Sequence, residues 1–238
     1  MSAREVGAAL GLDLRTVRPF ARQLIPLAGA VAVISVVAGR PQAVVLAGGV
    51  FAALGASYPF AIGERDGLDT LRAVLPVGRG TLVAGRYAFT LVLYLAAAVV
   101  AVPLAVLGAQ MRDVVVSASP GEIATSVALG FGVYALLAGT QLPVYYALGY
   151  TRGRMVAIVP LVLLCSAAGA AVSVLGDRIP DLDAWLARST DRLAPLALVG
   201  GAVVLAVSAL VSWRADRRRW ERTGGPREGV RGRGGAAR

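Results

Sequence analysis

The sequence predicts an all-α membrane protein with six transmembrane helices. An amphipathic interfacial helix precedes the first span, and a short amphipathic helix lies on the cytoplasmic side between the second and third. Three observations support this fold class. Hydrophobic residues make up 57% of the 238 residues and charged residues only 16%, a more apolar balance than soluble domains have. The apolar residues fall into six long stretches, and the arginines gather in alternate connections between them.

Each predicted span is close to the length that crosses a bilayer. A transmembrane helix needs ~20 apolar residues, because each residue rises ~1.5 Å across a hydrocarbon core of ~30 Å. The first stretch is short, and none contains Asp, Glu or Arg, whose charge costs roughly 2.5–3.5 kcal/mol at mid-bilayer. The spans are expected at residues 23–39, 43–62, 88–109, 123–148, 155–176 and 193–213, which form one membrane domain over residues 23–213.

The distribution of arginine predicts the orientation of the bundle. The chain has no lysine, and nineteen of its 24 basic residues precede the first span, join the second to the third or the fourth to the fifth, or follow the sixth. Positively charged connections tend to stay in the cytoplasm. We therefore expect a multi-pass protein of the cell membrane with both termini cytoplasmic.

The two terminal segments are predicted to lie outside the hydrocarbon core. Residues 1–22 carry an apolar stripe and an arginine stripe, which is typical of a helix at the membrane surface. The apolar stripe consists of Val6, Leu10, Leu14 and Val17. Residues 214–238, rich in arginine and glycine, are expected to form a disordered basic tail. After Trp220 the tail has no aromatic residue on which a base could stack, so no nucleic-acid partner is expected.

The connection between the second and third spans is longer than adjacent helices need. Within residues 64–87, Asp66 is placed to cap the start of a helix and Pro76 to end it. The leucines at helical spacing are Leu68, Leu71 and Leu75. The resulting short helix either rests its leucines in the lipid headgroup layer or docks against a partner.

Missing residue types exclude whole classes of chemistry. Without lysine there is no Walker loop for nucleotide phosphates, and without histidine there is no Ser-His-Asp triad and no HExxH zinc site. Cys165 stands alone in an apolar run, where packing is expected rather than a disulfide or metal cluster. We therefore expect no catalytic residue, no metal site and no cofactor bound by this chain.

Few polar groups lie within the predicted spans. Gln141 is the most polar of them, beside Thr140 and two residues before Pro143. Its amide is expected to bond between helices, and the alternative is that these residues line a pathway through the bundle. Local kinks are expected at the prolines within or near spans, which are Pro26, Pro59, Pro103, Pro143 and Pro160.

Three stretches of the chain resemble the permeases of ABC-2 type transporters. The stretch YPFAIGERDGLDTLRAVLPVGRGTLVAGRY is similar to the cytoplasmic segment between that family's second and third spans. LGLDLRTVRPFARQL, before the first span, resembles the family's amphipathic helix, and QLPVYYALGYTRGR, after the fourth, resembles another recurring stretch. The three occur in the family's order between residues 10 and 154, and the resemblance is taken to extend over residues 10–213, although this chain is smaller than many members.

The resemblance implies a permease subunit that pairs with a second permease, identical or paralogous, and with a separate ATP-binding cassette ATPase that uses ATP and Mg²⁺. It also implies export, and it makes the short helix after the second span a coupling helix. The leucines of that helix would seat in the ATPase and its charges would set the register. The implied docking residues are Glu64, Asp66, Leu68, Asp69, Leu71, Arg72 and Leu75.

Two other functions remain as alternatives. A secondary transporter driven by protons or sodium usually needs an ionisable residue in the membrane, and the predicted spans contain none. A membrane anchor or sensor without transport would have no use for the long segment over residues 64–87.

Overall fold

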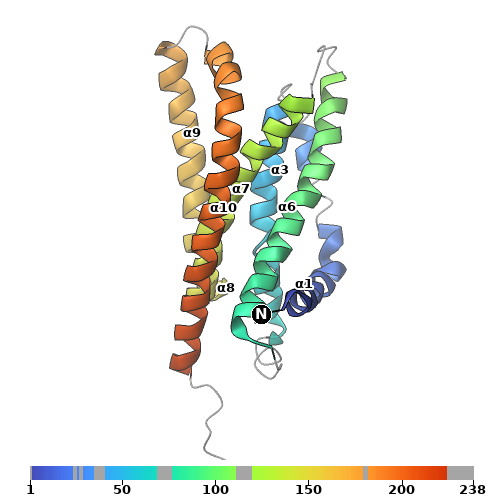
Figure 1. The fold of residues 1–238 in the computed structure, drawn as a ribbon, viewed down its shortest axis with the longest axis vertical. Helices are drawn as coiled ribbons and strands as arrows, with labels where there is room; N and C mark the ends of the chain where they lie inside the picture. Colours follow the sequence, from blue (N-terminus) through green and yellow to red (C-terminus); the bar gives the residue numbers. More distant parts are fainter. Residues whose placement is uncertain are drawn as a thin grey trace, which may run out of the picture.

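The computed structural model is a bundle of long helices that run alternately up and down (Figure 1). It describes residues 2–23, 26, 29–34, 41–68, 77–110, 120–178 and 182–223, with no strand among them. The elements are α1 (Ala3–Val17), the 3₁₀ helix η1 (Arg18–Gln23), α3 (Pro41–Gly55), α4 (Tyr58–Arg65), α6 (Arg79–Gln110), α7 (Pro120–Leu148), α8 (Tyr150–Ala157), α9 (Val159–Arg178) and α10 (Leu182–Thr223).

Five helical stretches among the described residues are long and apolar enough to cross a membrane. They are Ala43–Arg65, Arg79–Gly108, Gly121–Leu148, Tyr150–Ala167 and Leu193–Arg219. These stretches correspond to the second to sixth predicted spans. The predicted first span, residues 23–39, lies mostly outside the described residues, although 29–34 are helical. The Arg79–Gly108 stretch begins nine residues before the predicted start at position 88, so its first turns carry arginines that were expected in a connection.

Proline interrupts a span only where it stands near the start of a helix. Pro59 lies in the first turn of α4, and Pro160 is the second residue of α9. Short breaks precede both helices, and a proline there forfeits no intrahelical bond because the first N–H groups of a helix have no partner. Pro103 and Pro143 lie inside continuous helices. Breaks therefore stand directly before Pro59 and Pro160, whereas the kinks expected at these prolines stay a prediction.

The last helix is far longer than the span it contains. At 42 residues α10 is about 63 Å long, roughly twice the thickness of a hydrocarbon core. It continues ten residues past Trp213 to Thr223, where a disordered tail was expected. An ion pair from Arg217 Nε to Glu221 Oε1, 3.1 Å apart at i and i+4, supports this extension. Residues 224–238 lie outside the described residues.

The first helix begins with a reciprocal cap. The Ser2 hydroxyl accepts from the Glu5 backbone N–H while the Glu5 carboxylate accepts from the Ser2 N–H, which satisfies two of the donors at the helix start. The buried side of α1 carries Ala9, Asp13 and Val17 at four-residue spacing and packs against α6. The predicted apolar stripe shares Val17 with this buried side, whereas its Leu14 is 43% exposed on the outside of the bundle.

The core is built around α7, which packs against α10 on one side and α3 on the other. Its fully buried side chains include Tyr134, Leu137, Gln141 and Leu142. Glycines allow the close approach of the helices. A Cβ at Gly139 would lie 2.7 Å from Val204 Cγ1 of α10, and a Cβ at Gly49 would lie 2.7 Å from the Gly130 carbonyl oxygen.

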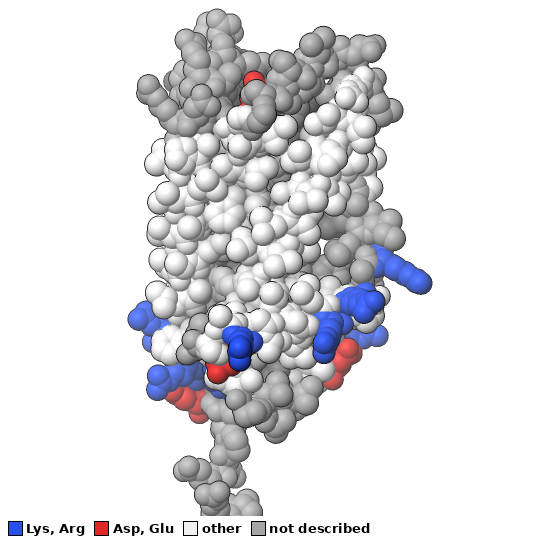
Figure 2. All heavy atoms as spheres, turned by 45° about the vertical axis from the view of Figure 1, so that its right-hand side comes forward, with Lys and Arg blue, Asp and Glu red and all other residues white. Residues whose placement is uncertain are grey.

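The outer faces of α6, α9 and α10 carry large exposed apolar side chains. Val99 of α6 is 72% exposed, Leu163 of α9 64% and Leu196 of α10 66%. The face in Figure 2 shows a broad band without charge above a lower end that carries arginines and acidic residues. Soluble proteins rarely leave so much contiguous apolar surface open to water, so this band matches the hydrocarbon region of a bilayer.

Candidate functional site

Charged side chains of the described residues gather at one end of the bundle (Figure 2). We call it the charged end. It is formed by α1, α4, the first turns of α6, α8 and the last turns of α10, which lie together at the bottom of Figure 1. The predicted docking segment leaves the described chain at this end, directly after α4.

A buried ion pair joins α1 to α6 at the charged end. Arg86 Nε lies 3.4 Å from Asp13 Oδ2, and Arg86 Nη2 lies 3.4 Å from Asp13 Oδ1. Asp13 is 4% exposed and Arg86 6%. The guanidinium carbon also lies 4.1 Å from the centre of the Phe60 ring of α4, which is a cation–π contact. One arginine of α6 therefore holds both α1 and α4.

The two neighbours of Arg86 reach other helices. A Cβ at Gly85 would lie 2.5 Å from the Ala9 Cβ, so only glycine lets α1 lie this close to α6. The Tyr87 hydroxyl bonds to Ser208 Oγ at 2.5 Å and Ser212 Oγ at 2.8 Å, both on α10. Successive residues of a helix point about 100° apart. The run Gly-Arg-Tyr thus contacts α1, α4 and α10 within one turn.

Two further contacts bind the charged end together. Arg79, the first residue of α6, lies 3.1 Å from Asp216 Oδ2 in the extension of α10. Glu64, in the last turn of α4, accepts hydrogen bonds from the backbone N–H groups of Tyr150 at 2.7 Å and Thr151 at 3.0 Å. Those two residues begin α8, so Glu64 joins the end of α4 to the start of α8.

The structure describes three of the predicted docking residues. Besides Glu64, it places Asp66 as the C-cap of α4, where the Asp66 N–H donates to the Ile62 carbonyl. The helix that Asp66 was predicted to cap lies outside the described residues from position 69 onward. Gly67 follows with a φ of 66°, a left-handed conformation that favours glycine. Leu68 is half-buried and packs against the cluster of Val17, Ile62 and Phe89. Asp69, Leu71, Arg72 and Leu75 lie outside the described residues.

The predicted pathway residues lie in the C-terminal half of α7. The Thr140 hydroxyl donates to the carbonyls of Leu136 at 2.9 Å and Leu137 at 3.0 Å, within its own helix. Gln141 is 2% exposed, and its Oε1 has no hydrogen-bond partner among the described residues. Pro143 lies inside α7. The interhelical bond expected of Gln141 is therefore not made by Oε1 to any described residue.

The described residues hold no group of three or more His, Cys, Asp or Glu side chains that could bind a metal ion. The contacts that sequence reasoning missed are those of Asp13, Arg86, Tyr87 and Phe60. All four belong to the stretches that resemble ABC-2 permeases, but nothing in the spacing of the residues pairs them.

Comparison with known protein families gives a match over most of the chain. A family model described as "ABC-2 family transporter protein" matches residues 11–215. The match begins within α1 and ends within α10. It includes the contacts of Asp13, Arg86, Tyr87 and Glu64 at the charged end. The search of curated proteins found no match.

Proposed function

The chain belongs to the ABC-2 transporter family, and on that premise we propose that it is the permease subunit of an ATP-binding cassette transporter, driven by a separate ATPase that binds the charged end. The observation that carries the proposal is the convergence of contacts at this end. Asp13, Arg86 and Phe60 connect the helices α1, α6 and α4, and Glu64 connects α4 to a fourth helix, α8. These contacts lie close to the point at which the described chain stops before residues 69–76.

The charged end is proposed to face the cytoplasm. Nineteen of 24 arginines belong to the segments on this side in the predicted topology, and positively charged segments tend to remain there. An ATPase that consumes cytoplasmic ATP would then meet this end of the bundle. Both termini would lie on the same side.

In the proposed cycle, ATP and Mg²⁺ bind to the ATPase pair, which closes and pulls on the segments after α4 of two permeases, identical or paralogous. Each bundle then changes between inward-facing and outward-facing packings, and the substrate is exported. This chain supplies no covalent chemistry. Its residues hold the docking segment and pass its movement into the helices.

The proposal is tested by reconstitution. We expect nucleotide hydrolysis that requires both this chain and its ATPase, and that responds to a panel of amphipathic compounds in proteoliposomes. Transport by the purified chain with no ATPase present would overturn the proposal. Labelling that placed the region of residue 71 outside the cell would overturn it as well.

The docking segment has its own test at Leu71. Leu71→Asp is expected to leave the chain inserted in the membrane and to abolish co-purification of the ATPase, because a carboxylate cannot enter an apolar seat without a partner. Leu71→Met, which keeps the apolar volume, is the matched control and should retain co-purification. Full retention by Leu71→Asp would show that the ATPase docks elsewhere.

A further inference from the structure

Helix α8 begins without a cap of its own. Its N-cap residue is Gly149, which has no side chain to accept from the free N–H groups of the first turn. The carboxylate of Glu64 fills that role from another helix, because its Oε2 accepts from the N–H groups of Tyr150 and Thr151. A charged acceptor at a helix start also meets the positive end of the helix dipole.

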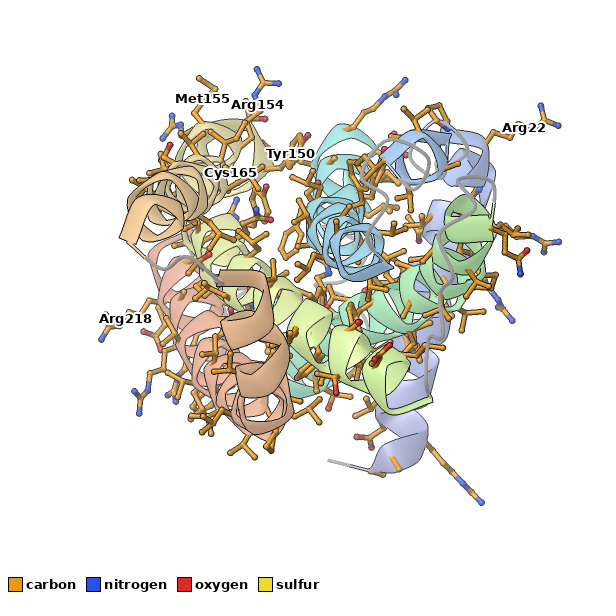
Figure 3. All side chains as sticks on the ribbon, turned by 90° about the horizontal axis from the view of Figure 1, so that it is seen from above. Arg22, Tyr150, Arg154, Met155, Cys165 and Arg218 are labelled. Carbon is orange, nitrogen blue, oxygen red and sulfur yellow. The ribbon has the colours of Figure 1, made fainter. Side chains whose placement is uncertain are left out.

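The backbone of Gly149 has a conformation that favours glycine, and the side chains of Glu64 and Arg219 lie close to it. Gly149 has a φ of 78°, which residues with a side chain rarely adopt. A Cβ there would lie 3.4 Å from Arg219 Nη2 and 3.5 Å from Glu64 Oε2. Arg219 comes from the extension of α10, so three helices meet at the start of α8. In Figure 3, Tyr150 lies between α8 and the helices α3 and α4.

The helix that carries Glu64 is the last part of the Ala43–Arg65 span and is separated from α3, the first part, by a turn. Residues 56 and 57 form a turn between α3 and α4. Phe60 lies one turn before Glu64 on the same face, with its ring centre 5.3 Å from that of Tyr145 and 5.0 Å from that of Tyr146 in α7. Together with the contact to Arg86, this face of α4 is held by α6, α7 and α8.

We propose that Glu64 is a positioning residue that caps α8 from α4 and passes the movement of the docking segment to α8 and α9. The inference rests on the proposed function and assigns Glu64 a role inside the permease rather than on the face that meets the ATPase. A pull on residues 69–76 acts first on the end of α4. Through Glu64 it then moves the start of α8, which continues into α9 after a break at Ile158.

The cap is tested by hydrogen exchange of the Tyr150 and Thr151 amides in the full-length chain. Glu64→Ala is expected to raise their exchange about tenfold, because both lose a charge-assisted acceptor. Glu64→Gln keeps an acceptor oxygen and should remain closer to wild type. Asp66→Ala, two residues along and exposed, is the matched control and should leave these amides unchanged. Unchanged exchange in Glu64→Ala would overturn the cap.

The transmission role is tested in the complex with the ATPase. Glu64→Ala is expected to co-purify with the ATPase as wild type does but to transport several-fold less substrate per ATP hydrolysed, and Glu64→Gln should restore most of that ratio. Loss of co-purification in both variants would assign Glu64 to docking and overturn the inference while the proposed function stands. Failure of the wild-type chain to bind any ATPase would overturn the proposed function. The hydrogen-exchange result would still show whether Glu64 caps α8.

Discussion

Arg86→Met is expected to destabilise the protein by about 3–5 kcal/mol, because it removes the guanidinium that pairs with the buried Asp13 carboxylate. Asp13 is 4% exposed, so water cannot replace the guanidinium without opening the contact between α1 and α6. The cation–π contact with Phe60 is lost as well. The effect should appear as a large fall in the thermal unfolding midpoint in detergent and in the yield of monodisperse protein.

Two comparisons separate this effect from a general sensitivity to arginine loss. Arg79→Met removes the partner of Asp216, but those side chains are 32% and 26% exposed, so about 0–1 kcal/mol is expected. The double variant Asp13→Leu with Arg86→Met removes both buried charges and should recover most of the lost stability. A double variant as unstable as Arg86→Met alone would contradict the role given to the ion pair between Asp13 and Arg86.

The expectation that spans carry no charge located the apolar helices but did not predict the ion pair between Asp13 and Arg86. Counting only uncharged stretches starts the third span at position 88, whereas α6 begins at Arg79 and buries Arg86. This expectation concerns charges at membrane depth, whereas Arg86 lies at the charged end, where a buried charge is tolerated because an opposite charge meets it. Asp13 did leave a signal in the sequence. It stands four residues from both Ala9 and Val17, on a side of α1 that is otherwise apolar.

The local sequence predicted which helices exist more accurately than it predicted where each helix ends. Five predicted spans match candidate spans of the structure because each is long and apolar. The end of α10 was placed ten residues early, since an arginine-rich segment reads as disordered when its partners are unknown. The ion pairs that Asp216 makes with Arg79 and Arg217 makes with Glu221 stabilise this extension.

The role of Glu64 could not be predicted from its neighbours in the chain. An acidic residue in a cytoplasmic connection is typical of a charged docking surface, and the resemblance assigned it there. Its hydrogen-bond donors lie 86 and 87 residues away, at the start of α8. A cap supplied by another helix leaves only a glycine at the N-cap position as a trace in the sequence. A glycine at position 149 is equally typical of an ordinary turn between two helices.

Gly49→Ala is expected to destabilise the bundle by about 1–3 kcal/mol, because it forces α3 away from α7. The added Cβ would lie 2.7 Å from the Gly130 carbonyl oxygen and 3.4 Å from its carbon. Both atoms belong to the backbone of α7, so no side-chain rotation relieves the clash. On the other side, a Cβ at Gly130 would lie 3.2 Å from the Val45 carbonyl oxygen, which shows that the two helices approach through both glycines.

Gly200→Ala is the matched control, because Gly200 lies inside α10 and a Cβ there would meet no atom within 4 Å. Alanine loses less backbone freedom than glycine on folding, so this variant should be as stable as wild type or more stable by up to about 1 kcal/mol. The two variants make the same chemical change, and only the distance between helices differs. Thermal unfolding in detergent should therefore separate them by several degrees. Equal midpoints would show that α3 and α7 can move apart without loss, and that the close contact at Gly49 does not hold the bundle together.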